Sequence, residues 1–142
     1  MTTDLERLGL AVKQAQYRNH RTMDAALRGV GVSLVQWDAL RAIDRMPGAS
    51  GHQLAAATFQ SDQSFGTLAG RLEERGLIAR SPGRGRRLQY ELTKRGHEAL
   101  EDGHRVASSV LEELFSPLDE SQRTALLHTL ETLTAAPSSA AD

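Results

Sequence analysis

Residues 61–96 read SDQSFGTLAGRLEERGLIARSPGRGRRLQYELTKRG and decide the fold. In the first part of this stretch Phe65, Leu68 and Leu72 recur at i, i+3 and i+7, so their side chains share one face of a helix. Ser61 precedes them and is a candidate N-cap, because its hydroxyl can accept a hydrogen bond from an early helical N–H. The sequence therefore predicts an amphipathic helix that begins directly after Ser61.

A predicted β-hairpin follows this helix. Leu77–Arg80 and Leu88–Leu92 are short strand-like runs, and Ser81–Arg87 between them reads SPGRGRR. Pro and Gly mark a turn, and the arginines make that turn basic. A helix followed by a basic hairpin is typical of a winged helix-turn-helix, a DNA-binding unit.

The polar face of the predicted helix lacks the Glu and Lys that normally fill a solvated face. Its residues are small or form hydrogen bonds, which suits base edges and phosphates in a DNA groove. Gln pairs with adenine, Arg with guanine or phosphate, and Ser or Thr with either. An ordinary polar face is the alternative. We expect DNA contacts from Ser61, Gln63, Ser64, Thr67 and Arg71.

The turn of the hairpin carries three arginines in four positions, Arg84, Arg86 and Arg87. A run of charge is usually a solvated face, but Arg also inserts well into a narrow minor groove. We therefore expect these three side chains to contact DNA. Arg75 and Arg80 are expected to clamp the phosphate backbone or to form salt bridges.

Charge is distributed unevenly along the chain, although the net charge is only −1. Residues 71–97 hold eight basic side chains against three acidic ones, whereas residues 98–142 hold two against nine. A basic patch on an acidic body can bind a polyanion and stay dissolved. The positive block coincides with the predicted helix and hairpin, so double-stranded DNA is the expected partner.

The composition of the 142 residues excludes several classes of protein. Because Cys is absent, the chain has no disulfides, thiolate metal sites or cysteine nucleophiles. No apolar run reaches the roughly 18 residues that span a bilayer. The N-terminus, MTTDLERLG, lacks the basic segment and apolar run of a secretory signal. We expect a cytoplasmic protein without a membrane partner.

Signatures of catalysis are also missing. The sequence contains no His-Glu-x-x-His, phosphate-binding loop or G-x-S-x-G motif. The acidic pairs Glu73-Glu74 and Glu112-Glu113 are adjacent, so each pair projects in two directions and cannot act as an acid and base on one substrate. We expect neither an enzyme nor a cofactor, although a small enzyme stays an alternative if a pocket gathers acid and base groups.

The remaining sequence predicts further helices on both sides of the opening stretch. Apolar periodicity and caps at Ser33, Ser50, Thr93 and either Asp119 or Ser121 support these helices. The predicted helices span residues 5–29, 34–46, 51–58, 93–115 and 119–134. The fold class is therefore mainly α, an α+β winged helix-turn-helix with six helices and a small two-stranded wing.

These elements divide the chain into four predicted parts. Residues 1–32 form an N-terminal dimerisation helix, 33–95 a DNA-binding lobe, 96–135 C-terminal dimerisation helices, and 136–142 a disordered tail. The flanking helices are amphipathic, and their apolar stripes need a partner. The economical partner is a second copy of the chain, so a homodimer is expected.

The order and motifs of these elements resemble the MarR family of bacterial transcriptional regulators. The similarity covers residues 5–134, and its motifs are Val35–Leu40 with Pro47-Gly48, Gln53-Leu54-Ala55, Leu72–Arg80 and Leu92–Gly96. The resemblance implies a homodimeric repressor of a pseudo-palindromic promoter. It also implies release by a small, often phenolic or aromatic acid ligand, held between the DNA-binding lobe and the dimerisation helices.

The wing departs from the family pattern. Members often carry Asp-Arg-Arg where this chain has Arg84-Gly85-Arg86. By resemblance, Arg86 matches the arginine that reaches the minor groove, but Arg84 replaces the Asp that orients it. We therefore expect this wing to bind by charge more than by a fixed geometry.

Two smaller sets of residues are weaker candidates. Tyr17, Arg18, His20 and Trp37 are proposed to line the ligand pocket, although Trp37 on an apolar helix face is more often core. His97, Glu101 and His104 share a helix face and are weak metal candidates, because one helix seldom supplies a closed site. The alternatives to a ligand-released repressor are a metal-sensing regulator and a winged-helix module for protein contacts.

Overall fold

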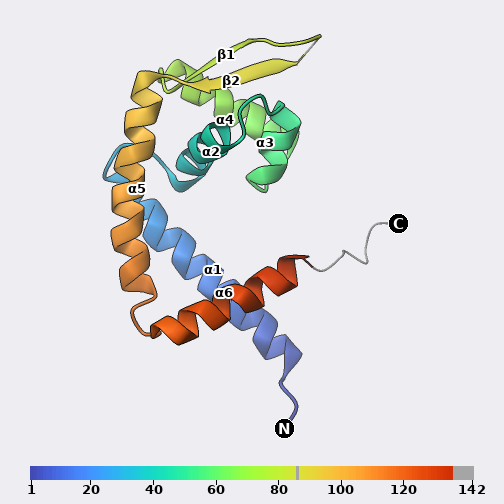
Figure 1. Ribbon diagram of the computed structural model, residues 1–142, viewed down its shortest axis with the longest axis vertical. Coiled ribbons are helices and arrows are strands. Elements are labelled where there is room, and N and C mark those ends of the chain that lie inside the picture. The colour runs from blue at the N-terminus through green and yellow to red at the C-terminus, as the bar shows by residue number, and fades with distance from the viewer. Residues whose placement is uncertain (86, 136–142) are drawn as a thin grey trace. The chain divides into compact units, whose positions relative to one another are not determined.

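The structure is a computed structural model that describes residues 1–85 and 87–135. Arg86 and the predicted disordered tail, 136–142, lie outside the described residues. The described residues form six helices and one antiparallel pair of strands (Figure 1), which confirms the predicted fold class. In chain order they are α1 (Leu5–Arg28), α2 (Leu34–Arg45), α3 (Gly51–Ala57), α4 (Asp62–Glu74), β1 (Ile78–Pro82), β2 (Leu88–Leu92), α5 (Lys94–Leu114) and α6 (Glu120–Ala135).

Helix starts coincide with the predicted caps. Ser33 and Ser50 each form a capping box, in which the serine hydroxyl accepts from the third helical N–H and a Gln side chain accepts from the serine N–H. The Ser61 hydroxyl accepts from the N–H of Ser64 at 3.1 Å. Asp119 accepts from the N–H of Gln122, which settles the two candidates for the last cap in favour of Asp119. Local sequence therefore fixes where these helices begin.

The wing is longer than predicted on its first strand. Ser81 and Pro82 were expected in the turn, but they pair with Gln89 and Leu88. Pro82 is tolerated because it ends an edge strand, where its missing N–H costs no ladder hydrogen bond. The N–H of Gly83 donates to Arg87 O at 2.7 Å and closes a shorter turn.

The described chain forms two compact units, Met1–Val110 and a second that begins at Leu111. The first unit holds the core, to which the winged unit and the C-terminal half of α1 both contribute. Fully buried side chains of this kind are worth about 1.5–3 kcal/mol each relative to exposure. The largest of them are Phe65, Leu27, Leu40, Leu54 and Leu72.

Trp37 joins α2 to α5 inside this unit. Its indole is only 3% exposed, and Nε1 donates to the carbonyl oxygen of Leu100 at 3.2 Å. Gly103 lies so close that a Cβ there would overlap the indole. Trp37 is therefore a core residue in this structure.

A second joint ties the wing to the start of α5. The Thr93 hydroxyl donates to Gly76 O at 2.6 Å and accepts from the N–H of Gly96 at 3.0 Å. A Cβ at Gly96 would overlap the carbonyl oxygen of Leu77, so the backbones approach too closely for any other residue. The Leu92–Gly96 motif is thus a structural joint.

The second unit is built differently. α6 has no buried residue, and Leu126, Leu127, Leu130 and Leu133 are between 37% and 63% exposed. Three of these leucines, Leu126, Leu127 and Leu130, line an apolar groove of about 460 Å³ together with Leu111 and Phe115. Among the residues described, no helix has the length and apolar content needed to cross a bilayer.

Candidate nucleic-acid interface

Helix α4 separates an apolar face from a polar one. Phe65 and Leu72 are buried to 1% and 0% exposure. The five predicted DNA-contacting side chains are all exposed on the other side of the helix, and most of them line a surface depression of about 350 Å³. They are Ser61, Gln63, Ser64, Thr67 and Arg71. The burial of one face therefore fixes which side chains α4 presents outward.

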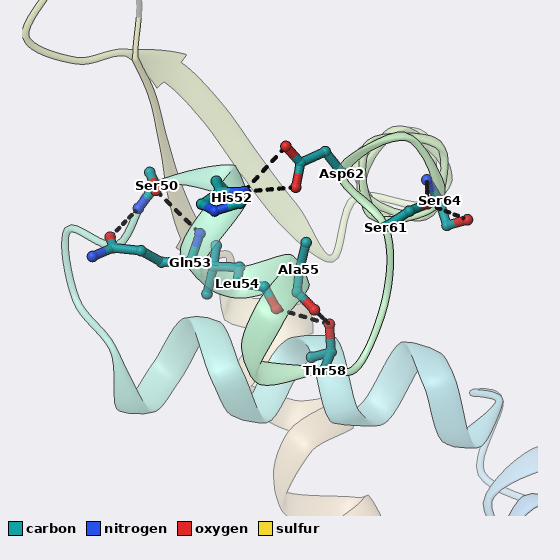
Figure 2. Close-up of polar contacts among 9 residues, drawn as sticks. All are labelled: Ser50, His52, Gln53, Leu54, Ala55, Thr58, Ser61, Asp62 and Ser64. Carbon is teal, nitrogen blue, oxygen red and sulfur yellow. Dashed lines mark hydrogen bonds and ion pairs between the residues drawn. The ribbon is translucent and has the colours of Figure 1, made fainter. Parts of the chain in front are cut away.

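A short turn holds α3 against α4. The Thr58 hydroxyl donates to Leu54 O at 2.8 Å and ends α3, as Figure 2 shows. Phe59 follows with a φ of 59°, in the left-handed region that disfavours side chains, and it is 98% exposed. This strained residue lets the chain reverse within three residues before Ser61 starts α4.

The starts of α3 and α4 are joined by a hydrogen bond between two side chains that the sequence did not suggest. Figure 2 shows the His52 ring facing the Asp62 carboxylate, with Nδ1 2.9 Å from Oδ1 and 3.1 Å from Oδ2. His52 looked isolated in the sequence, and Asp62 was expected to cap or to point away from phosphate. The ten-residue separation carries no local signal; only the helix-turn-helix packing brings the two helix starts together.

Tyr90 anchors the wing to α4. Its ring meets Phe65 edge-on with centroids 5.8 Å apart, and a Cβ at Gly51 would lie 2.8 Å from its Oη. Arg84 and Arg87 are both exposed at the turn of the wing. Arg86, the third predicted wing contact, lies outside the described residues. One buried contact thus sets the wing relative to both helices of the helix-turn-helix.

Arg80 and Arg75 are engaged within the chain. Arg80 forms a salt bridge with Glu73 at 3.2 Å, and hydrogen bonds from the Arg80 side chain and backbone lower the pKa of Glu73. Arg75 donates to Gln36 at 2.9 Å and to Gly31 O at 2.6 Å. The salt-bridge alternative is confirmed for Arg80, and Arg75 fastens the end of α4 to the loop before α2.

The four predicted ligand residues have different surroundings in the single chain. Tyr17, Arg18 and His20 are exposed on α1, and the Tyr17 ring lies under Arg21, 5.7 Å from its guanidinium carbon. The Trp37 indole instead contacts Arg41, whose guanidinium carbon lies 4.6 Å from the ring centroid. Periodicity placed Trp37 correctly on the apolar face but could not show what covers that face.

A cavity of about 310 Å³ lies between α2 and the end of α3, and its lining includes Arg41 and its partner Asp38. Arg41 and Arg45 supply positive charge, and Met46 and Phe59 supply apolar walls. Arg41 has spare hydrogen-bonding capacity: its bond to Asp38 is long at 3.4 Å, and its Nε is buried without a partner among the described residues. Burial raises the pKa of Asp38, while Arg41 and His20 oppose that shift. The cavity suits a small ligand that combines an apolar ring with an anionic group.

His97 and His104, two of the weak metal candidates, lie in different surroundings. His104 packs edge-on against Trp37 with centroids 5.3 Å apart. His97 lines a separate cavity of about 410 Å³ with Asp44, Tyr90 and Glu91. Across residues 1–85 and 87–135, no three His, Asp or Glu side chains are grouped as metal ligands.

Comparisons with known proteins agree on one family. The model of the MarR family matches residues 30–87, which include α2, α3, α4 and the first strand of the wing, β1. The HTH-type transcriptional repressor Rv2887 of Mycobacterium tuberculosis is 29% identical over 113 residues, covering 78% of this chain and 81% of that protein.

Solved structures extend the agreement beyond the matched segment. A probable transcriptional regulator from Pseudomonas aeruginosa is 28% identical, with a TM-score of 0.82 over 92% of this chain and 99% of that one. The M. tuberculosis MarR family protein Rv2887 in complex with salicylic acid is 26% identical, with a TM-score of 0.73 over 89% and 95%. Together with the polar face of α4, the anchored wing and the joint at Thr93, these matches show that the chain is similar to MarR family proteins over most of its length.

Proposed function

We propose that this chain is a DNA-binding transcriptional repressor, active as a homodimer and released by a small aromatic acid. One observation carries the proposal: the exposed side chains of α4 form a polar, uncharged-to-basic face, while the opposite face is buried beneath the wing anchor Tyr90. This arrangement presents a helix to the major groove and a basic turn to the neighbouring groove.

The similar proteins support this assignment. Rv2887 is a transcriptional repressor, and its structure has been solved with salicylic acid. Similarity to a repressor also agrees with the prediction that the chain is not an enzyme. Because its target is bacterial DNA, we place the protein in the cytoplasm.

Direct readout is assigned to the outward face of α4. Gln63 suits adenine, Arg71 suits guanine or phosphate, and Ser61, Ser64 and Thr67 suit either bases or phosphates. Arg84 and Arg87 add charge at the wing, and Arg86 is retained from the sequence as the residue that enters the minor groove. Each phosphate that these arginines neutralise adds about 0.9 to the salt dependence of binding.

The homodimer accounts for the exposed apolar helices. The leucines of α6 have no cover in the second unit, and Leu5, Leu8 and Val12 of α1 are exposed in the first. A second copy would bury these side chains, as a two-fold interface does. The two recognition helices would then read half-sites about 34–36 Å apart.

The effector is proposed to bind the cavity beside Arg41. A carboxylate would pair with Arg41 and Arg45, while the ring would lie against Met46 and Phe59. Phe59 belongs to the turn that leads into α4, so a bound ligand would act on the recognition helix through that turn. The proposed dimer has one arrangement that reads both half-sites and another that cannot. A ligand releases the dimer from DNA only if it binds the second arrangement more tightly than the first.

The test is selection of bound fragments from genomic DNA of the encoding organism, at about 50 mM and about 200 mM salt. We expect a pseudo-palindromic sequence, recovered by wild type and lost by Arg71→Ala, with a shallower salt slope for Arg86→Ala. Arg105→Ala, which removes an exposed arginine of α5, is the matched control and should bind like wild type.

Salicylate then tests the effector cavity. It should release wild type from the selected duplex and fail to release Arg41→Met, which keeps the stem but loses the charge. Binding that is equally weak for wild type and Arg71→Ala, without sequence preference, would remove the repressor proposal and favour a module for protein contacts.

A further inference from the structure

His52 and Asp62 form a close contact in which one ring nitrogen lies within hydrogen-bond distance of both carboxylate oxygens. Nδ1 of the imidazole lies 2.9 Å and 3.1 Å from the two carboxylate oxygens. The Nδ1 edge of the ring is therefore committed to Asp62, and Figure 2 shows the two side chains facing each other between the starts of α3 and α4.

Stability does not explain this pair. The side chain of His52 is 79% exposed and that of Asp62 is 69% exposed. Exposed ion pairs contribute about 0–1 kcal/mol, because water screens the charges and ordering the side chains costs entropy. The helix dipole favours a carboxylate at the first position of α4, but it does not account for the imidazole held against that carboxylate.

The position of the pair relates it to DNA. In helix-turn-helix proteins the first helix crosses the phosphate backbone, and the first residues of the recognition helix approach the base edges. α3 is that first helix and carries His52 as its second residue, while Asp62 is the first residue of α4. An unpaired Asp62 would repel phosphate there, and the imidazole offsets that charge.

We infer that His52 is a phosphate contact, positioned by Asp62, and that DNA binding takes up one proton per subunit at this ring. The inference rests on the proposed function, since it needs a DNA-bound state. With Nδ1–H donated to Asp62, Nε2 can donate to a phosphate oxygen only when the ring is protonated. The proton comes from solvent, and no bond other than N–H forms or breaks.

Other titratable groups near the ring are few. α4 contributes Asp62, the contact already described. β2 packs against α3 and contributes Tyr90, whose Oη lies against the neighbouring Gly51. α2 also packs against α3, and its Asp38 and Arg41 are paired with each other. An imidazole is the side-chain type that changes its charge near neutral pH, and His52 supplies one at this place.

The experiment measures duplex affinity by fluorescence anisotropy between about pH 6 and pH 8, at constant ionic strength. The probe is a labelled duplex recovered in the selection described above. Wild-type affinity should fall about threefold to tenfold per half-site across this range, because less of the free protein carries the proton. Ring NMR of His52 should show its titration moving to higher pH when the duplex is added.

Three variants separate the roles. His52→Gln should lose the pH dependence and, at pH 6, about 0.9 of the salt slope per half-site. Asp62→Asn should bind more tightly than wild type at pH 8, because a negative charge leaves the interface, and should depend less on pH. His128→Gln is the matched control in α6 and should keep the wild-type profile.

The outcomes distinguish this inference from the proposed function. Wild-type binding with an unchanged pH profile and salt slope in His52→Gln overturns the inference and leaves the repressor in place. Failure of wild type to bind any duplex, even at pH 6 and low salt, overturns both.

Discussion

Helices α4 and α6 have similar apolar patterns but opposite surroundings. In α4, Phe65, Leu68 and Leu72 are buried by the helices and strands of the same unit. In α6 the leucines are spaced in the same way, yet no residue of that helix is buried. An apolar stripe therefore identifies a contact face without saying whether the cover comes from the same chain. The apolar face of α4 is buried within its own unit, whereas the leucines of α6 are exposed in theirs.

The largest effect is expected in α4, the helix whose apolar face is buried. Phe65→Ala should lower the free energy of unfolding by about 3–5 kcal/mol, because it removes a buried ring and leaves a cavity under Tyr90. Urea denaturation followed by circular dichroism measures the change. Leu133→Ala in α6 is the comparison, and an equal loss there at low protein concentration would contradict the contrast between the two helices.

The next largest effect is expected in α6, the helix whose leucines are exposed. Leu127→Asp combined with Leu130→Asp should weaken self-association by at least about a hundredfold, roughly 2.7 kcal/mol, because charges would enter an apolar interface. Sedimentation equilibrium would detect this loss. Far-ultraviolet circular dichroism should stay close to wild type, and a dimer of wild-type affinity would show that α6 is not in the interface.

A smaller effect is expected where α5 is fastened to the lobe. Trp37→Phe keeps a ring but removes the N–H donated to Leu100 O, which should cost about 1–2 kcal/mol. Thermal unfolding gives the measurement. Tyr17→Phe, on the exposed part of α1, is the control and should change the melting temperature little.

The smallest effect concerns pH and compares two aspartates. A hydrogen bond from Arg28, then one from the N–H of Leu34, lower the pKa of Asp24. Its folded pKa lies below the unfolded value, so it stabilises the fold at neutral pH and the gain disappears as acid protonates the folded form. Asp24→Asn should cost about 1 kcal/mol at pH 7 and much less near pH 3.

Asp38 should behave in the opposite way. Burial raises its pKa, so the charged form is disfavoured in the folded state and acidification favours folding at this site. Asp38→Asn should therefore be neutral or slightly stabilising at pH 7. Urea unfolding at both pH values compares the two variants, and equal losses would show that Leu34 N–H and Arg28 do not hold Asp24.

Local features were predictable from the sequence because they depend on neighbours in the chain. The serine caps at Ser33, Ser50 and Ser61 are examples, as is the apolar face of α4. The DNA-contacting residues on its other face remain predictions. The sequence alone left Asp119 and Ser121 undecided as caps, and only the hydrogen bond to Gln122 separates them.

Long-range pairings were not predictable, because nothing in the chemistry of one partner specifies the other. His52 with Asp62 and Arg75 with Gln36 are separated by 10 and 39 residues, and each depends on how whole helices pack. The same limit applies to Trp37: its apolar position was evident, but the α5 backbone that covers it was not.

Phe59 carries a consequence for engineering. A side chain at a φ of 59° costs about 1–2 kcal/mol relative to glycine, and this ring gains no burial in return. Phe59→Gly is thus a one-step route to a more stable lobe. Phe59 also lines the cavity beside Arg41, so the same substitution would remove an apolar wall of the proposed effector site while it relieves the strain of the turn.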